Sequence, residues 1–205
     1  MKYTTLRVTD AGVVLYDFHV ERLAPEGPAG LAAFARFARE ATPGIYGVAL
    51  AGGELRAERR TGSQLVEGMP ARLMVSPFAA QRGAFPKSGS PSAYDAVRLP
   101  GVATLLTSAD GSEILESCVA AVLGWDGTHF VGVPEDLPRV ASVAEAAVSA
   151  TLPFVRLPLR IDDRLPLILL NAVAGPCTVS TGRSPVAADA VLLLTEVLRR
   201  STRRP

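Results

Sequence analysis

Apolar and polar positions in the first half of the chain predict strands grouped around one helix. Residues 3–8 and 13–18 are rich in β-branched and aromatic side chains, and T-D-A-G lies between them, which predicts a hairpin. Apolar residues recur at helical spacing over 29–41, so a helix is expected there. A second hairpin is predicted at 45–60, with A-G-G-E as its turn, and one more strand is predicted at 71–78.

The second half repeats this mixture of strands and helices. Asp-Gly pairs interrupt the apolar segments of 103–133, which predicts antiparallel strands joined by tight turns. Apolar residues at helical spacing predict a helix over 138–150 and another over 185–199. Between these helices, 154–161 predicts a strand, and 161–172 predicts a short helix that runs into a strand.

The composition changes at residues 83–92, G-A-F-P-K-S-G-S-P-S, where glycine, serine and proline predominate. Such a stretch is typical of a linker or an irregular loop. We therefore predict an N-terminal α+β domain over 1–82, an inter-domain linker over 83–92 and a C-terminal α+β domain over 93–205.

A chain of 205 residues with 48% hydrophobic and 20% charged residues has the composition of a globular protein with a sizeable core. Its net charge of +1 gives no basic surplus that would indicate a nucleic-acid partner. The apolar runs at 165–170 and 190–194 are too short to span a bilayer, and the N-terminus lacks the apolar stretch of a signal peptide. We expect a cytoplasmic protein without a membrane partner.

Cysteine and lysine usage limits the possible chemistry. Cys118 and Cys177 are too few for a disulfide framework, and no cluster of histidine and cysteine has metal-ligand spacing, so no metal site is expected. Nineteen arginines stand against two lysines, Lys2 and Lys87. A mechanism that requires an internal lysine can therefore use Lys87 alone.

Three motifs stand in order along residues 3–182. They are Y-T-T-L-R-V followed by H-V-E-R-L, then D-G-S-E-I-L-E-S-C-V-A-A-V-L, then L-L-N-A-V-A-G-P-C-T-V. Together they resemble the F-x-T and H-x-x-R-L, D-x-x-G-x-x-x-E and N-[SA]-x-x-G-x-x-P-V patterns of the class IV aminotransferase family. These fold-type IV enzymes use pyridoxal phosphate and include branched-chain aminotransferases, D-amino-acid aminotransferases and aminodeoxychorismate lyases.

The resemblance implies a two-domain α+β architecture like that of D-amino-acid aminotransferase, with the cofactor in the cleft between the domains. Arg22 would bind the cofactor phosphate through its planar guanidinium. Glu116 would hydrogen-bond the pyridine nitrogen and keep it protonated. Lys87 would form the Schiff base and then act as acid and base on the substrate. The resemblance also implies a homodimer.

Each of these residues also has a plainer interpretation. Arg22 can be a solvated arginine on a turn, and Glu116 can be a solvent-facing strand residue between apolar neighbours. His19 is expected to be structural, packing or capping the adjacent turn, and His129 is expected to be exposed beside its Asp-Gly turn. Asn171 is expected to satisfy backbone groups in a turn rather than to take part in catalysis.

The chain departs from the family pattern at several positions. It begins almost at the F-x-T strand, and Lys87 lies twenty-nine residues before Glu116, with a shortened helix between them. L-P-R-V-A-S at 137–142 stands where the family has L-x-G-[IV]-[TM]-R, so Arg139 replaces the glycine that lets backbone approach a phosphate. The asparagine of the second motif is replaced by Ala121.

These observations lead to one main hypothesis and two alternatives. The main hypothesis is a pyridoxal-phosphate-dependent aminotransferase or aminodeoxychorismate-lyase-like enzyme that acts on an amino acid or amino-carboxylate. The first alternative is a diverged, cofactor-free homologue that keeps the fold as a small-molecule-binding or interaction protein. The second is an unrelated α+β protein in which the motifs match by coincidence.

Overall fold

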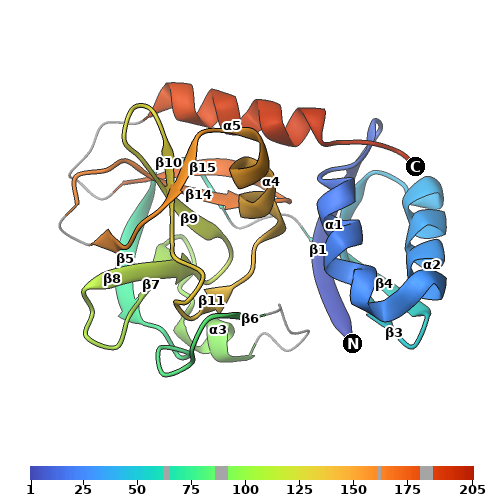
Figure 1. Ribbon diagram of the computed structural model, residues 1–205, viewed down its shortest axis with the longest axis horizontal. Helices are drawn as coiled ribbons and strands as arrows, with labels where there is room; N and C mark the ends of the chain where they lie inside the picture. The colour runs from blue at the N-terminus through green and yellow to red at the C-terminus, as the bar shows by residue number, and fades with distance from the viewer. Residues whose placement is uncertain (62–64, 86–91, 161–162, 181–186) are drawn as a thin grey trace.

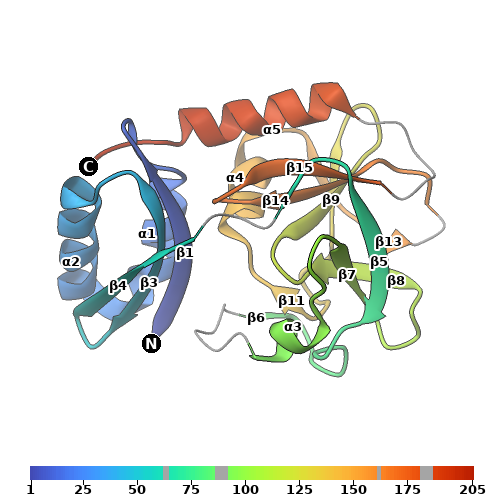
Figure 2. The same ribbon diagram turned by 180° about the vertical axis from the view of Figure 1, so that it is seen from behind.

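The computed structural model describes residues 1–61, 65–85, 92–160, 163–180 and 187–205 of the chain. Figure 1 shows two bodies side by side, each built on its own sheet, and Figure 2 shows the same pair from behind. The sheets have four and nine strands, and a two-stranded pair forms a third, separate sheet. None of the helices in these ranges is long and apolar enough to cross a membrane.

The N-terminal body is an antiparallel sheet of order β2-β1-β3-β4, with two helices on one face. Leu6, Val48 and Phe34 belong to the core cluster between the sheet and the helices. The predicted hairpin is present as β3 and β4, and its turn uses Gly52 and Gly53 at positive φ. The strands are β1 (Lys2–Thr9), β2 (Gly12–Val13), β3 (Gly44–Ala51) and β4 (Glu54–Arg60), and the helices are α1 (Tyr16–Leu23), η1 (Ala24–Glu26) and α2 (Gly27–Glu40).

The predicted strand at 13–18 is wrong beyond Val13. Leu15 adopts a left-handed conformation with φ of 59°, and the chain then enters helix α1. Tyr16, His19 and Leu23 recur at helical spacing and are buried on one face of that helix. His19 and Arg22 therefore lie on a helix, not on a turn after a strand.

The C-terminal body is a curled sheet of order β12-β10-β9-β14-β15-β5-β7-β8-β13. Helices α4 and α5 pack on it, and one core cluster joins them to Phe130, Ile168 and Leu123. Its elements are β5 (Met69–Val75), α3 (Ser92–Val97), β7 (Ala103–Thr107), β8 (Glu113–Ser117), β9 (Ala121–Trp125), β10 (Phe130–Gly132), α4 (Val143–Thr151), β12 (Phe154–Arg156), β13 (Leu159–Arg160), β14 (Leu167–Asn171), β15 (Gly175–Ser180) and α5 (Ala188–Arg200).

Strand β5 belongs to the nine-stranded sheet, where it pairs in parallel with β15 and β7. The change from one sheet to the other thus falls between Arg60 and Met69, which differs from the predicted boundary at 83–92. The glycine- and serine-rich composition of 83–92 does not by itself tell a linker between bodies from a segment within one of them. Residues 86–91 of that segment lie outside the described ranges.

A short parallel pair, β6 (Ala84–Phe85) with β11 (Arg139–Val140), holds the chain before residue 86 against the loop that leads into α4. Gly83 and Ala84 donate backbone hydrogen bonds to the carbonyls of Asp136 and Glu135, and Ala141 donates to the carbonyl of Phe85. This pairing joins segments that are far apart in the sequence.

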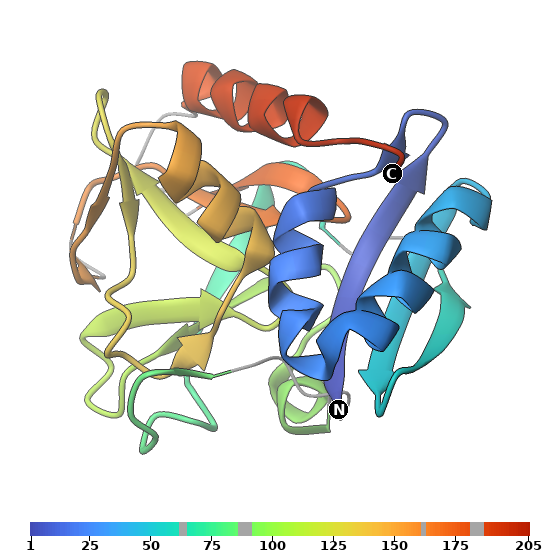
Figure 3. The ribbon, with the colours of Figure 1, turned by 45° about the vertical axis from the view of Figure 1, so that its right-hand side comes forward.

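Residues 201–204, which we call the C-terminal tail, connect the two bodies. Arg203 exchanges backbone hydrogen bonds with Val13 at 2.9 and 3.2 Å, and Tyr16 donates its N–H to the carbonyl of Ser201. The Arg203 side chain forms an ion pair with Asp17 and lies over the ring of Tyr16. Helix α5 packs on the C-terminal body, so the tail ties that body to the first hairpin (Figure 3).

Candidate active site

Glu116 is a buried carboxyl group at the centre of the candidate site. It lies on β8 with a side chain 5% exposed. Its Oε1 accepts a hydrogen bond from the Tyr94 hydroxyl at 2.7 Å, and its Oε2 accepts one from the Val140 N–H at 3.0 Å. Burial raises the pKa of Glu116 to about 7, although these hydrogen bonds and nearby Arg139 act in the opposite direction. The expectation of a solvent-facing residue does not hold.

Tyr94, which sequence analysis did not single out, comes from helix α3. Its ring lies 5.1 Å from that of Phe78, which in turn lies 5.1 Å from the ring of Phe85, the last described residue before Lys87. Burial and the Glu116 carboxyl raise the pKa of Tyr94, so its hydroxyl stays protonated and donates. The start of this helix could not be identified from the sequence, because Ser92 and Ala93 have the same kind of composition as the preceding glycine-, serine- and proline-rich segment.

Arg22 approaches the same place from the N-terminal body. It lies near the end of α1, which packs beside α4 (Figure 3), and its Nη2 donates to the carbonyl of Ala141. Burial lowers the pKa of Arg22 to about 10, which still leaves the guanidinium charged at neutral pH. Arg22 and Glu116 therefore bind adjacent residues, Ala141 and Val140, although they come from different bodies of the chain.

Helix α4 begins immediately beyond this point. Ser142 is its N-cap, and the Ser142 side chain accepts a hydrogen bond from the N–H of Glu145 at 3.3 Å. Within the described ranges, the N–H groups of Val143 and Ala144 have no acceptor, as is usual in the first turn of a helix. The free N–H groups and the Arg22 guanidinium together favour an anion.

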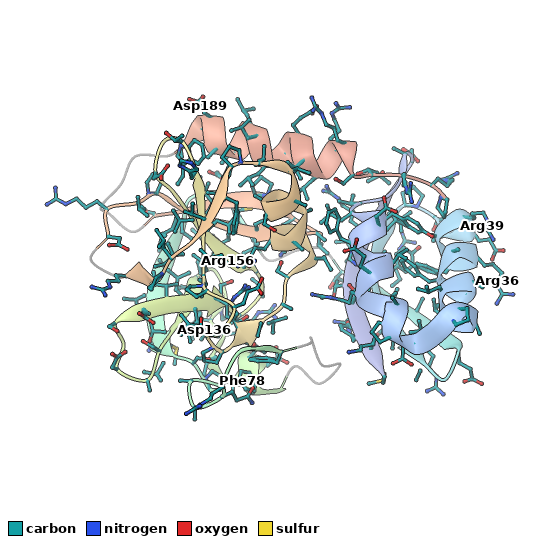
Figure 4. All side chains as sticks on the ribbon, in the orientation of Figure 1. Arg36, Arg39, Phe78, Asp136, Arg156 and Asp189 are labelled. Carbon is teal, nitrogen blue, oxygen red and sulfur yellow. The ribbon has the colours of Figure 1, made fainter. Side chains whose placement is uncertain are left out.

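Arg139 lies where the family pattern has glycine, and it forms a buried ion pair that the sequence did not predict. Its Nη1 is 2.7 Å from Glu145 Oε2, and both side chains are almost completely buried. Arg156 contacts the other oxygen of Glu145 at 2.5 Å and also binds the Val133 carbonyl. Figure 4 shows Arg156 inside the C-terminal body. The three side chains form a network that fixes the first turn of α4 to β11 and β12.

Lys87, the predicted catalytic lysine, lies outside the described residues. The structure places Phe85 beside Ala141, so the chain leaves the described range next to the groups that bind Arg22 and Glu116. The roles of Lys87, Arg22 and Glu116 in cofactor chemistry remain predictions.

The other residues singled out in the sequence have structural contacts. His19 is fully buried, and its Nδ1 lies 2.8 Å from Thr4 Oγ1 on β1. His129 is partly exposed, and its Nδ1 lies 3.5 Å from Asp126 Oδ2. Asn171 accepts from the N–H groups of Val173 and Ala174 and donates to the carbonyl of Val119, so its predicted role in satisfying backbone groups is confirmed.

The residues at the candidate site fit a phosphorylated pyridine cofactor at both of its ends. Arg22 and the first N–H groups of α4 are suited to a phosphate, and a buried carboxyl such as Glu116 is suited to a pyridinium nitrogen. The carboxyl and the guanidinium are separated by the two-residue segment Val140–Ala141, which contacts both.

Comparison with known proteins finds matches in structure but not in sequence. No protein-family model and no curated protein matches the chain in sequence. A hypothetical aminotransferase from Mycobacterium tuberculosis, in a form with α-ketoglutarate and PMP bound, matches over 98% of this chain and 88% of its own, with 16% identity and a TM-score of 0.68. A fold IV-transaminase from Curtobacterium pusillum matches over 98% and 84%, with 18% identity and a TM-score of 0.69. A 4-amino-4-deoxychorismate lyase from Pseudomonas aeruginosa matches over 97% and 90%, with 16% identity and a TM-score of 0.65.

The chain therefore has the two-body α+β fold of the fold-type IV pyridoxal-phosphate enzymes. The resemblance to class IV aminotransferases and aminodeoxychorismate lyases, inferred from three sequence motifs, is confirmed at the level of the fold. At 12–19% identity among such neighbours, the fold says nothing by itself about which reaction is catalysed.

Proposed function

We propose that this protein is a pyridoxal-phosphate-dependent enzyme that acts on an amino acid or amino-carboxylate, as an aminotransferase or an aminodeoxychorismate-lyase-like enzyme. The observation that carries the proposal is that Arg22, on helix α1 of the N-terminal body, and Glu116, on strand β8 of the C-terminal body, converge on the segment Val140–Ala141. Coincidental motif matches would not be expected to bring a guanidinium and a buried carboxyl to one two-residue segment. The expected homodimer and cytoplasmic residence remain predictions.

In this proposal each residue has a defined task. Arg22 and the N–H groups of Val143 and Ala144 hold the phosphate, and Glu116 holds the pyridine nitrogen. Tyr94 donates to Glu116 and keeps its carboxyl oriented. The bound cofactor supplies an electron sink for the substrate's α-carbon, and Lys87 carries the proton to and from that carbon.

The test uses purified protein with and without added pyridoxal phosphate. We expect a new absorbance band, and after borohydride reduction and digestion we expect the cofactor mass on the peptide that contains Lys87. Lys87→Ala should abolish both, and Arg22→Met should weaken cofactor binding at least about tenfold, because a charge-assisted bidentate contact is lost. Lys2→Ala is the matched control. Trapping on Lys2, or an unchanged band in Lys87→Ala, would refute the assignment.

One observation favours the alternative of a cofactor-free homologue. Both oxygens of Glu116 already accept hydrogen bonds from the protein, and the Val140 N–H that faces the site is one of the donors. If no absorbance band appears at millimolar cofactor and no lysine is trapped, the alternative is the better description. The same purified protein would then be used to search for small-molecule ligands.

A further inference from the structure

Strand β4 is the longest edge strand without a neighbour on its outer side in the described parts of the chain. It ends the four-stranded sheet, and six of its seven residues are exposed, so little of the chain covers it. The opposite edge of that sheet, β2, is covered by the C-terminal tail through the bridge between Val13 and Arg203. The outer strands of the nine-stranded sheet, β12 and β13, have only three and two residues. Figure 1 shows β3 and β4 on the side of β1 that is away from the C-terminal body.

The backbone groups on the outer side of β4 are available for hydrogen bonds. Antiparallel pairing with β3 uses the N–H and C=O groups on one side of the strand only. Among the described residues, no further backbone hydrogen bond involves Glu54–Arg60. An edge strand with free backbone groups is a template for another extended strand, and main-chain hydrogen bonds then supply much of the affinity.

The charges along β4 have opposite signs on the two sides of its central residue, Ala57. Its sequence is E-L-R-A-E-R-R, and the charged side chains that share the sheet face opposite the helices are Glu54, Arg56, Glu58 and Arg60. If two copies of β4 pair antiparallel about Ala57, Glu54 lies opposite Arg60 of the second copy. In the same register Arg56 lies opposite Glu58 of the second copy. Each of the four charged residues therefore faces an opposite charge.

The neighbouring registers do not give this match. A two-fold axis between antiparallel strands keeps each face of the sheet continuous, so the register can change only in steps of two residues. A step in one direction places Arg56 opposite its own copy and Glu54 opposite Glu58. A step in the other direction places Glu58 opposite its own copy and Arg56 opposite Arg60. Like charges directly opposite each other destabilise a sheet. Charged residues on an edge strand usually prevent pairing, but on β4 they favour one register with a second copy.

We propose that β4 pairs antiparallel with β4 of a second copy of this chain, in the register centred on Ala57. The two four-stranded sheets then form one continuous sheet. On the helix side, Leu55 packs against the hydrocarbon part of Arg59 of the second copy. Seven residues from each copy are far fewer than the roughly 20–30 residues a side of a standard interface, so the dimer is weak and reversible. The inference goes beyond the proposed function and does not rest on it, because neither Arg22 nor Glu116 lies on β4.

The first test measures dimerisation by sedimentation velocity, over about 1–500 µM protein, a range suited to a weak dimer. We expect the sedimentation coefficient of the wild type to rise with concentration. Arg56→Glu places glutamate opposite glutamate twice in each dimer and should weaken association at least about tenfold. The double variant Arg56→Glu/Glu58→Arg restores opposite charges in the same register and should dimerise like the wild type. Arg72→Glu, the same charge change at an exposed position of β5, is the matched control and should not affect association.

A disulfide cross-link tests the register. In the proposed pairing Ala57 faces its own copy, with Cβ atoms about 4.5–5.5 Å apart, so Ala57→Cys should give a disulfide-linked dimer under mild oxidation. Arg56→Cys should not, because position 56 faces position 58 of the second copy. The wild type, which keeps Cys118 and Cys177, measures the background of linked dimer.

Four results would overturn the proposal. They are a wild type that stays monomeric over the whole concentration range, an Arg56→Glu variant that associates as the wild type does, a double variant that does not recover, and linkage through Arg56→Cys rather than Ala57→Cys. Circular dichroism of each variant checks that the fold is kept. None of these results bears on whether pyridoxal phosphate is trapped on Lys87, so failure of this surface and failure of the proposed function are distinguishable.

Discussion

Glu116 is the residue at which burial and charge conflict most directly. Its carboxyl is removed from water, and its folded pKa is about 7 against an ordinary value of 4.5. Between these two values the folded chain binds more protons than the unfolded chain, so the free energy of unfolding falls as the pH rises. The stability associated with the protonated carboxyl is complete below about pH 4.5 and is lost as the pH passes about 7.

Glu116→Gln should therefore remove this pH dependence. A shift from 4.5 to about 7 corresponds to about 3 kcal/mol. The fall in unfolding free energy between pH 5 and pH 8 should be smaller by about 2.5 kcal/mol in Glu116→Gln than in the wild type, as measured by urea denaturation. The amide can still accept from Val140 and meet the Tyr94 hydroxyl, so the fold should be kept. Glu113→Gln, on the same strand, should behave as the wild type, and an unchanged pH dependence in Glu116→Gln would contradict the argument.

The sequence identified Glu116 and Arg22 as candidates through their place in family motifs. It could not show that Glu116 is buried, because alternation with apolar neighbours on a strand usually indicates a solvent-facing side chain. It also missed Tyr94, since a six-residue helix after a stretch of glycine, serine and proline leaves little periodic signal. Partners that come from distant segments cannot be inferred from local pattern.

At the scale of elements, the ion network at the start of α4 is the main departure from the family pattern. Arg139 replaces a glycine, and its guanidinium is matched by Glu145 in the first turn of the helix. A buried ion pair often contributes little net stability, but loss of one partner leaves an uncompensated buried charge.

Glu145→Met should accordingly lower the free energy of unfolding by about 3–5 kcal/mol, because Arg139 and Arg156 lose their shared carboxylate. The double variant Arg139→Met/Glu145→Met should recover most of this loss, since Arg156 keeps the Val133 carbonyl and Glu135. Chemical denaturation of the single and double variants measures both effects. A loss below about 1 kcal/mol in Glu145→Met, or no recovery in the double variant, would show that the network is not coupled as described.

Elements with a long periodic pattern were predicted correctly, and so were the short strands of 103–133, but other short elements were not. The hairpin of β3 and β4 and the helices α2 and α5 follow from alternation, helical spacing and paired glycines. Residues 16–18, the start of α1, were predicted as the end of a strand because tyrosine and phenylalanine favour strands, and a short apolar run fits either structure. The two-residue strands β6 and β11 exist through their pairing with each other, which no local signal reports.

At the scale of the whole molecule, the C-terminal tail joins the two bodies at Gly12. A Cβ atom at Gly12 would lie 2.2 Å from the backbone carbon of Arg203, so glycine is required for the close approach of the two segments. Its φ of +121° also disfavours other residues. The first hairpin and the tail thus depend on one position.

Gly12→Ala should release the tail. Gly127→Ala is the matched control, because Gly127 also has positive φ but its added Cβ would meet nothing within 4 Å. Both variants carry backbone strain of about 1 kcal/mol or more. Hydrogen exchange at the amides of Val13 and Arg203 should become faster in Gly12→Ala and should stay at the wild-type rate in Gly127→Ala. Equal exchange in the two variants would mean that strain, not contact with the tail, governs the hairpin.

The pairing of the tail with the first hairpin has a consequence for protein synthesis. Arg203 lies 186 residues beyond Asp17, its ion-pair partner. At ribosomal speeds of about 5–20 residues per second, Arg203 is synthesised on the order of ten seconds or more after Asp17. The N-terminal sheet therefore emerges first but receives these contacts only after residue 203 has been made, and a nascent chain that stops before residue 200 would leave the first hairpin open to chaperones and proteases.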